Sequence, residues 1–449
     1  MIKKRVSLRI HYLQELFWIR YTDKILTVWG LTGHERAMLR KIRIEQLGPG
    51  MYVSQLDHSW LNIPLFRPRI STMEEVKTLA RHGVMEVVID TDKGLDVPET
   101  PAKTQPAGAR PAGSKAPADA KLNQVDYLEE IAPANTVFEQ TEASVFHVME
   151  AVRQGSTPEL SQARNAVERM IGSLLRNKDA LTSLVSLRSH SESVFQHAVR
   201  VCVLALALAE HLGFSREDMR SLGMGALLHD VGKMHMSAHL LEKTAPFTAE
   251  EYQEYKRHAL NGAKSLETSG IEKNALLVML QHHERPDGSG FPQGLQDSQI
   301  SDVAKMVAIA DTFDNVLHKA QFQERTDPHM ALKFMNNFSG TGLDGALLAA
   351  FNSALGVYPV GTLVRLSDHR TGIVLSVHHT PSLVPKVWVV FDANQRMLEK
   401  PVILDLAQQT GKQQVTIVGS VNPDKMGFDL EGYVNTQGLF SGKVHSQSA

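Results

Sequence analysis

The chain has 449 residues, 43% hydrophobic and 21% charged, an ordinary composition for a globular protein of two to four domains. Its formal net charge of −2 argues against a general nucleic-acid binder or a protein held on an acidic membrane surface. The single cysteine, Cys202, excludes an intrachain disulfide, and the longest apolar run, residues 201–209, is much shorter than the roughly 20 residues of a membrane span. We therefore expect a cytoplasmic protein that neither binds DNA nor spans a membrane.

The first part of the sequence contains one small folded segment between two segments without a core pattern. Within residues 1–40, residues 10–18 are mildly amphipathic but have no clear partner, and Met38 directly precedes a strand-like run, so we expect a leader that is disordered or precedes the native start. Residues 41–95 follow a strand, turn, strand, helix and strand pattern, which predicts a small α/β domain. Residues 96–121 are rich in Pro, Ala, Gly and Lys and nearly lack large apolar side chains, which predicts a linker.

Helical periodicity dominates residues 122–357, where apolar side chains recur at spacings of three and four. We divide this region into a helical connector, residues 122–184, and a helical domain, residues 185–357. Three predicted helices carry the polar residues that matter most. They are a helix capped by Ser215 that runs into His229 and Asp230, a helix opened by the capping box of Thr248 and Glu251, and a helix over residues 303–317 that contains Asp311.

The period changes to two after Tyr358. Residues 362–366, 372–377 and 386–391 are strand candidates, so we expect a small β appendage over residues 358–423. Residues 424–449 show no period, and we expect an irregular tail. The predicted fold class is mainly α, with a small α/β domain before the helices and a small β appendage after them.

Five histidines and two aspartates in the helical region are of the residue types that bind divalent iron, manganese or zinc. These candidate ligands are His197, His229, Asp230, His258, His282, His283 and Asp311. A lone histidine on an apolar face is more often a structural residue. A His-Asp pair followed by Gly and Lys, a His-His doublet and a later helical Asp together favour a metal site, and the lack of thiolates favours a hard ion.

The adjacent His229 and Asp230 would project about 100° apart on a helix, so that one binds a single ion while the other reaches a second. A carboxylate has two oxygens, which makes Asp230 the natural bridge. Two ions about 3.5–4 Å apart can clamp a phosphodiester and activate a water for in-line attack. Lys233, one turn after Asp230, would bring positive charge to the reacting phosphorus, so we assign catalytic roles to Asp230 and Lys233.

Residues 282–292 run from the His-His doublet into a Gly-rich turn. Gly288 and Gly290 permit positive φ angles and a close approach of the backbone to a ligand. We place Arg285, Gly288, Gly290 and Phe291 in a substrate-binding set together with Lys233.

The sequence His-Asp-Val-Gly-Lys at residues 229–233, followed by His-His-Glu-Arg-x-Asp-Gly-Ser-Gly-Phe-Pro at residues 282–292, resembles the HD-GYP family within the HD superfamily of metal-dependent phosphohydrolases. The resemblance covers roughly residues 185–357. It implies an all-helical HD-type catalytic domain with two or three metal ions, commonly iron or manganese. The implied substrate is cyclic di-GMP, opened to pGpG and sometimes cut on to GMP. Residues 41–95 resemble the domain of unknown function DUF3391, which often precedes this catalytic domain.

The motif match implies that the seven candidate ligands bind metal, with Asp230 bridging and Lys233 on the scissile phosphate. Three positions depart from the family pattern. Phe291 replaces the signature tyrosine, and Ser193 stands where members with three metals carry Glu, so we favour two ions. Ala320 replaces an arginine that is a candidate phosphate contact, a loss of roughly 1.5–3 kcal/mol. Lys319 and Arg325 are the nearby cations that could substitute, and they complete the substrate-binding set.

The leading hypothesis is a cytoplasmic bacterial cyclic di-GMP phosphodiesterase with two divalent ions, iron or manganese. One alternative is a weakly active or inactive cyclic di-GMP receptor or scaffold that signals through its N-terminal domain or its partners. Another is an HD phosphohydrolase that acts on a different nucleotide. Candidate protein partners are diguanylate cyclases, other signalling proteins and a second copy of the chain.

Overall fold

The chain forms two compact units, divided between residues 120 and 121. The computed structural model describes residues 39–51, 53–56, 70, 72–81, 86–90, 95, 125–188, 193–241, 243, 245–318, 326–377, 384–409, 414–441 and 447–448. The predicted linker and all but the last two residues of the predicted leader lie outside these ranges.

The smaller unit is a three-stranded antiparallel sheet with one helix, as its sequence pattern predicts. In chain order it contains β1 (Leu39–Arg43), β2 (Val53–Leu56), helix α3 (Met73–Arg81) and β3 (Glu86–Asp90). The strand order in the sheet is β1-β3-β2, and both pairs are antiparallel. Ile42, opposite Val87 in the β1–β3 pair, is buried together with Leu79 of α3 and Ile89. These apolar side chains form a core of their own.

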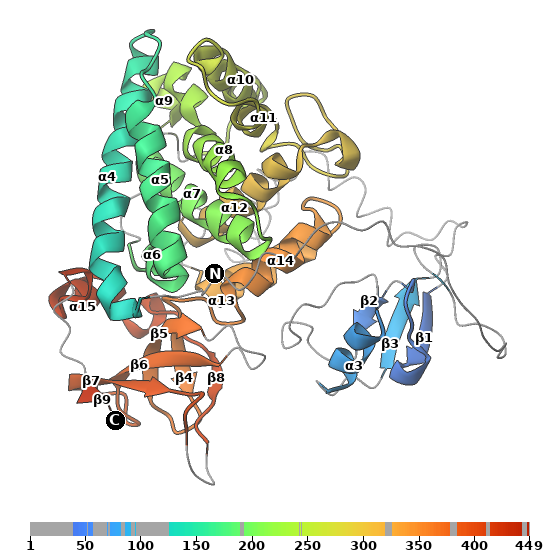
Figure 1. The fold of residues 1–449 in the computed structure, drawn as a ribbon, viewed down its shortest axis with the longest axis vertical. Helices are drawn as coiled ribbons and strands as arrows, with labels where there is room; N and C mark the ends of the chain where they lie inside the picture. Colours follow the sequence, from blue (N-terminus) through green and yellow to red (C-terminus); the bar gives the residue numbers. More distant parts are fainter. Residues whose placement is uncertain are drawn as a thin grey trace, which may run out of the picture. The chain divides into compact units, whose positions relative to one another are not determined.

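The larger unit is a bundle of helices with a sheet at its C-terminal end (Figure 1). Its helices, in chain order, are α4 (Tyr127–Arg153), α5 (Ser161–Arg176), α6 (Lys178–Leu187), α7 (Val194–His211), α8 (Arg216–Leu228), the 3-10 turn η3 (Val231–His235), α9 (Ala238–Leu241), α10 (Ala249–Leu266), α11 (Lys273–Gln281), η4 (Asp297–Gln299), α12 (Asp302–His318), α13 (Pro328–Met335), η5 (Asn336–Phe338) and α14 (Gly345–Leu355).

Helix α7 is the central helix of the bundle. It packs against α4, α6, α8, α12 and α14, and its residues 198–209 are all buried. By length and composition alone α7 could cross a membrane, with a mean hydropathy of 1.3 over 18 residues, but 67% of it is buried inside the protein. That degree of burial is what the core helix of a globular domain shows.

Two helix starts follow the predicted capping chemistry. The Ser215 side chain accepts a hydrogen bond from the Asp218 N–H at the start of α8. Thr248 and Glu251 form a reciprocal capping box at the start of α10. Helix α12 contains Asp311 as expected, so all three ligand-bearing helices predicted from the sequence are present.

The sheet of the larger unit has six strands in the order β8-β4-β5-β6-β7-β9. The predicted strands correspond to β4 (Leu363–Leu366), β5 (Thr371–Val377) and β6 (Pro385–Phe391), and the structure adds β7 (Met397–Asp405), β8 (Ile417–Ser420) and β9 (Gln447–Ser448). Strand β7 escaped prediction because most of its side chains are only partly buried, without the alternation that marks a half-buried strand.

The tail expected to be irregular instead contains helix α15 (Leu430–Thr436) and the turn η7 (Leu439–Ser441). Asp429 caps α15 by accepting the Gly432 N–H, and Tyr433 lies against the buried Trp388 of β6, with ring centroids 5.7 Å apart. A helix this short is not stable in isolation, so α15 depends on packing against the sheet.

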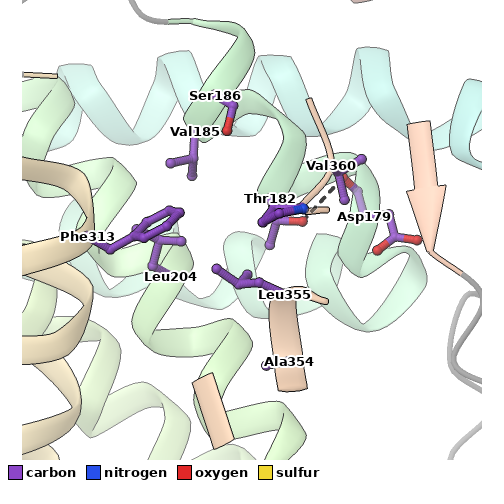
Figure 2. Close-up of a pocket in the computed structure, with 10 residues that line it drawn as sticks. Asp179, Thr182, Val185, Ser186, Leu204, Phe313, Ala354, Leu355 and Val360 are labelled. Atoms are coloured by element: carbon purple, nitrogen blue, oxygen red, sulfur yellow. Dashed lines mark hydrogen bonds between the residues drawn. The ribbon is translucent and has the colours of Figure 1, made fainter. Parts of the chain in front are cut away.

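The predicted connector and β appendage share one hydrophobic core with the ligand-bearing helices. Buried Asp179 of α6 accepts the backbone N–H of Val377 in β5, which ties the sheet to the helices. A cavity of about 10 Å³ lies beside this junction, lined by Asp179, Thr182, Phe313 and Val360 among others (Figure 2). It is the size of one water molecule and includes none of the predicted site residues.

Candidate metal centre

Five segments of the helical bundle bring all seven predicted ligands together. They are His197 on α7, His229 and Asp230 between α8 and η3, His258 on α10, His282 and His283 directly after α11, and Asp311 on α12. Six of the seven are buried or nearly so, and His283 is half-buried.

The chain changes from α-helix to 3-10 turn at the His-Asp pair. A Cβ atom on Gly232 would lie 1.9 Å from the His258 carbonyl oxygen and 2.5 Å from the Gly262 nitrogen, so only glycine lets η3 touch α10. This contact brings Asp230 Oδ1 to 3.4 Å from His258 Nε2. The glycine of the motif therefore serves the geometry of the ligands.

The ligand atoms form two groups that share Asp230. Asp230, His258, His282 and His283 make one group, and His197, His229 and Asp230 make the other, with the ligand atoms of each group within 4.8 Å of one another. Asp311 joins the second group, because its Oδ1 lies 3.1 Å from His197 Nε2 and 3.9 Å from His229 Nε2.

Three imidazoles are oriented by carbonyl groups of the preceding helical turn. The Nδ1 atoms of His229, His258 and His282 lie 2.8, 2.5 and 3.0 Å from the carbonyl oxygens of Ala226, Tyr255 and Val278. A carbonyl can only accept a hydrogen bond, so the proton sits on Nδ1 and the Nε2 lone pair faces the centre. This is the tautomer in which an imidazole binds metal through Nε2.

His197 is oriented differently, by a carboxylate on another helix. Its Nδ1 donates to Asp314 Oδ2 at 2.7 Å, and the Arg200 guanidinium donates to both carboxylate oxygens of Asp314, at 2.6 and 3.0 Å. His318 also lies 3.0 Å from Asp314. Asp314 and Arg200 are 1% and 2% exposed, so this ion pair is held in the core. Asp314 therefore fixes the ring plane and tautomer of His197.

The residues present fit a metal site. Among the described residues, the buried atoms His229 Nε2, His258 Nε2, His282 Nε2, His283 Nε2 and Asp230 Oδ1 have no hydrogen-bond partner. Unpartnered buried polar atoms are rare, and five converging on one point have the donor chemistry of a site for divalent cations.

The electrostatics keep the imidazoles in their ligating form. Burial lowers the pKa of His258 to about 4 and that of His282 to about 3, and burial together with neighbouring imidazoles lowers the pKa of His283 well below its usual value. Burial alone would raise the pKa of Asp230, but Lys233 and His229 outweigh it and hold that pKa well below the usual range. Lys233 forms an ion pair with Asp230.

The Gly-rich turn packs tightly on the His-His doublet. A Cβ atom on Gly290 would lie 2.4 Å from both the Arg285 nitrogen and the Glu284 Cα. The buried Glu284 carboxylate accepts the N–H groups of Gln293 and Leu295 at 2.7 and 2.9 Å, which closes the loop. The Phe291 ring stacks on His283, with centroids 4.5 Å apart and planes 28° apart.

The other predicted substrate-binding residues have mixed outcomes. The half-buried Arg285 lies in the turn, where it donates to the carbonyl oxygens of His282 and Glu284, and Gly288 adopts a φ of 77°. Lys319, Ala320 and Arg325 lie outside the described residues. Ser193 accepts the Phe195 N–H and caps α7.

Sequence reasoning missed two buried acids, Glu284 and Asp314. Each had a signal in the sequence. Glu284 directly follows the His-His doublet, and Asp314 follows Asp311 by three residues, which places both on one side of a helix.

Comparison with known proteins bears on the identity of this site. Residues 184–347 match the HD domain family, and residues 39–163 match the domain of unknown function DUF3391. The chain is 34% identical to a cyclic di-GMP phosphodiesterase of Pseudomonas aeruginosa over 383 residues, which cover 83% of this chain and 90% of that protein. The chain belongs to the HD-GYP family.

Two further relatives match shorter segments of the chain. A cyclic di-GMP phosphodiesterase response regulator of Xanthomonas campestris is 34% identical over 195 residues, 41% of this chain and 50% of that protein. A 3′3′-cGAMP-specific phosphodiesterase of Vibrio cholerae is 35% identical over 123 residues, 27% of this chain and 28% of that protein. The family assignment confirms the resemblance seen in the motifs and the all-helical catalytic domain.

Proposed function

We propose that this HD-GYP protein is a metal-dependent phosphodiesterase that hydrolyses cyclic di-GMP to pGpG. The observation that carries the proposal is the pair of ligand groups sharing Asp230. A single carboxylate with one oxygen available to each group is the arrangement that holds two ions close enough to act on one phosphodiester. The relative from Pseudomonas aeruginosa, which matches across most of both chains, supports the choice of substrate.

His258, His282 and His283 would hold one ion, His197, His229 and Asp311 the other, and Asp230 both. Ser193 supports two ions rather than three, because it caps α7 at the position where members with three metals carry Glu. Nitrogen and carboxylate donors without thiolate support iron or manganese. The one cysteine, Cys202, is buried on α7 and donates to the Gly223 carbonyl oxygen, away from these groups.

The residues around the ligands have distinct chemical tasks. When bound, the two ions would supply the Lewis acidity that polarises the phosphodiester and lowers the pKa of an attacking water. Lys233 keeps its positive charge beside Asp230, because that carboxylate raises the lysine pKa despite burial. Lys233 would stabilise negative charge on the phosphoryl oxygens, and Arg285 would add a second cation beside the His-His doublet.

The direct test is turnover by the metal-replete protein. Protein purified without oxygen is analysed for metal content, incubated with cyclic di-GMP, and its products are separated by chromatography. Two equivalents of iron or manganese and accumulation of pGpG are expected. Tight binding without product would overturn the phosphodiesterase assignment and favour the receptor alternative.

The second candidate substrate is 3′3′-cGAMP, because the chain is 35% identical over 123 residues to a Vibrio cholerae phosphodiesterase specific for that dinucleotide. The same chromatography with 3′3′-cGAMP separates the two candidates by the ratio of kcat/KM. A cytoplasmic location is supported by the single cysteine and by the burial of α7 in the core. Diguanylate cyclases, other signalling proteins and a second copy of the chain stay predicted partners.

A further inference from the structure

Four aromatic rings lie beside the metal centre without joining the hydrophobic core of the larger unit. We call this set the aromatic wall; it consists of Phe247, Tyr252, Tyr255 and Phe291. All four are half-buried, and none of them belongs to the core cluster formed by the described residues or packs against it. Burial in the fold therefore does not explain why large rings are gathered here.

The aromatic wall is continuous. Tyr255 lies 5.4 Å from Phe247 and 6.3 Å from Tyr252, measured between ring centroids, and the two tyrosine rings are nearly parallel, 16° apart. Phe291, from the Gly-rich turn, lies 6.2 Å from Tyr252 and 6.1 Å from Tyr255.

The wall begins at the metal ligands and extends away from them. Tyr255 lies 4.8 Å from the His258 ring, and Phe291 stacks on His283. Tyr252 lies six residues before His258 on α10, which corresponds to about 9 Å along the helix axis. A ligand whose phosphate sits between the two ligand groups thus has aromatic surface alongside it.

Two lysine ammonium groups lie over the tyrosine rings of the wall. Lys233 Nζ is 5.7 Å from the Tyr255 centroid, and Lys256 Nζ is 5.2 Å from the Tyr252 centroid. Aromatic rings interleaved with cations are the chemistry by which proteins bind single-stranded nucleotides, because the rings stack on bases while the cations neutralise phosphates.

We propose that the aromatic wall, through the ring of Tyr252, stacks on one purine base of the cyclic dinucleotide. This inference rests on the proposed function, because it takes the phosphodiester at the metal centre as its starting point. Every purine has a π face, so stacking contributes affinity without selecting guanine over adenine. The wall would therefore hold cyclic di-GMP and 3′3′-cGAMP equally, and selection between them would depend on other contacts.

The test measures binding separately from turnover. The metal-replete full chain is titrated by equilibrium dialysis with the bis-phosphorothioate analogue of cyclic di-GMP, which resists hydrolysis. Tyr252→Leu removes the ring, and we expect Kd to rise about 5- to 150-fold with metal content unchanged. Tyr252→Phe keeps the ring and should bind within about twofold of wild type. Phe291→Leu is a second variant in the same wall and should also raise Kd.

Tyr358→Leu is the matched control. Tyr358 is also half-buried and also stacks on a histidine, His329, at 4.7 Å, but it lies outside the wall. We expect its Kd to stay at the wild-type value. A Tyr252→Leu protein that binds within twofold of wild type would overturn the proposal, as would a Tyr252→Phe protein that loses as much affinity as Tyr252→Leu.

Hydrolysis of cyclic di-GMP by the wild-type protein is followed in parallel. If the wild type binds the analogue but forms no pGpG, the proposed function fails, while the comparison of Tyr252→Leu with Tyr252→Phe still decides the stacking proposal. If the wild type does not bind the analogue, both proposals are overturned.

Discussion

The ligand groups and the aromatic wall lie side by side, yet the protein builds them differently. The imidazoles of His229, His258 and His282 are buried and fixed by carbonyl groups of their own helical turns. The rings of the wall are half-buried and contact one another and the rings of His258 and His283. The packing of the helical core therefore sets the metal positions, whereas side-chain contacts near the surface set the wall. Substitutions in the first region should abolish activity, and those in the second should adjust it.

The largest effect is expected at the residue common to both ligand groups. Asp230→Ala should lose both ions and at least about 10³-fold in kcat/KM, because a bridging carboxylate and its charge disappear together. Metal analysis and turnover of cyclic di-GMP measure this. Asp302→Ala, an exposed aspartate at the start of α12, is the control and should resemble wild type. Wild-type turnover by Asp230→Ala would show that the site has been assigned to the wrong residues.

Removing the metal should affect the two units unequally. Ions that bind only the folded state add stability, about 2.7 kcal/mol at a free concentration of 100 times Kd. Treatment with a chelator should lower the thermal unfolding temperature of the larger unit and abolish turnover, and added iron or manganese should restore both. The smaller unit has its own core, so its unfolding should not change. An unfolding temperature of the larger unit that does not respond to chelation would contradict metal binding by its core helices.

A smaller loss of metal affinity is expected at Asp314, which orients the candidate ligand His197. Asp314→Asn removes the charge that orients His197 and pairs with Arg200, and such changes typically cost 10- to 100-fold in metal affinity. The loss should fall on the group containing His197 and leave the group containing His283 filled, so one equivalent of metal should remain. Asp179→Asn, an equally buried aspartate on α6, is the matched control for general destabilisation. Equal loss of metal in both variants would argue against a positioning role.

The residues that the sequence singled out as ligands are gathered by the structure at one centre, because ligand chemistry is local to each residue and the motifs carry it. Their binding of metal stays a prediction. His229, Asp230, His282 and His283 occur as adjacent pairs, and helical periodicity then placed Asp311 on the correct helix. The role of Asp314 could not be read in the same way, since it depends on α7 and α12 lying side by side. The aromatic wall could not be predicted from the sequence either, because Tyr252 and Phe291 are 39 residues apart and come into contact only when the Gly-rich turn packs on α10.

The fold shows the same division between local and long-range signals. Helix caps at Ser215 and Thr248 were predicted because a cap needs only three or four neighbouring residues. The sharing of one core by α4, α6 and the sheet was not predicted, since contacts such as that between Asp179 and Val377 join residues 198 positions apart. Helix α15 was missed for the same reason, because its stability depends on the distant Trp388.

The smallest effect is expected at Phe291, where this chain departs from the family signature. Its ring stacks on His283 and forms T-shaped pairs with Tyr252 and Tyr255. Phe291→Tyr keeps that ring at a half-exposed position, so its kcat/KM for cyclic di-GMP should stay within about twofold of wild type. Phe291→Leu loses an aromatic pair, so its kcat/KM should fall about 2- to 12-fold. Steady-state kinetics of the two variants, measured together, separate the contribution of the ring to kcat/KM from that of the hydroxyl. A Phe291→Tyr protein with turnover raised tenfold or more would show that the missing hydroxyl limits the turnover of this enzyme. The distinction between a rigid metal centre and an adjustable wall would then not hold at Phe291, the residue where the two regions are in contact.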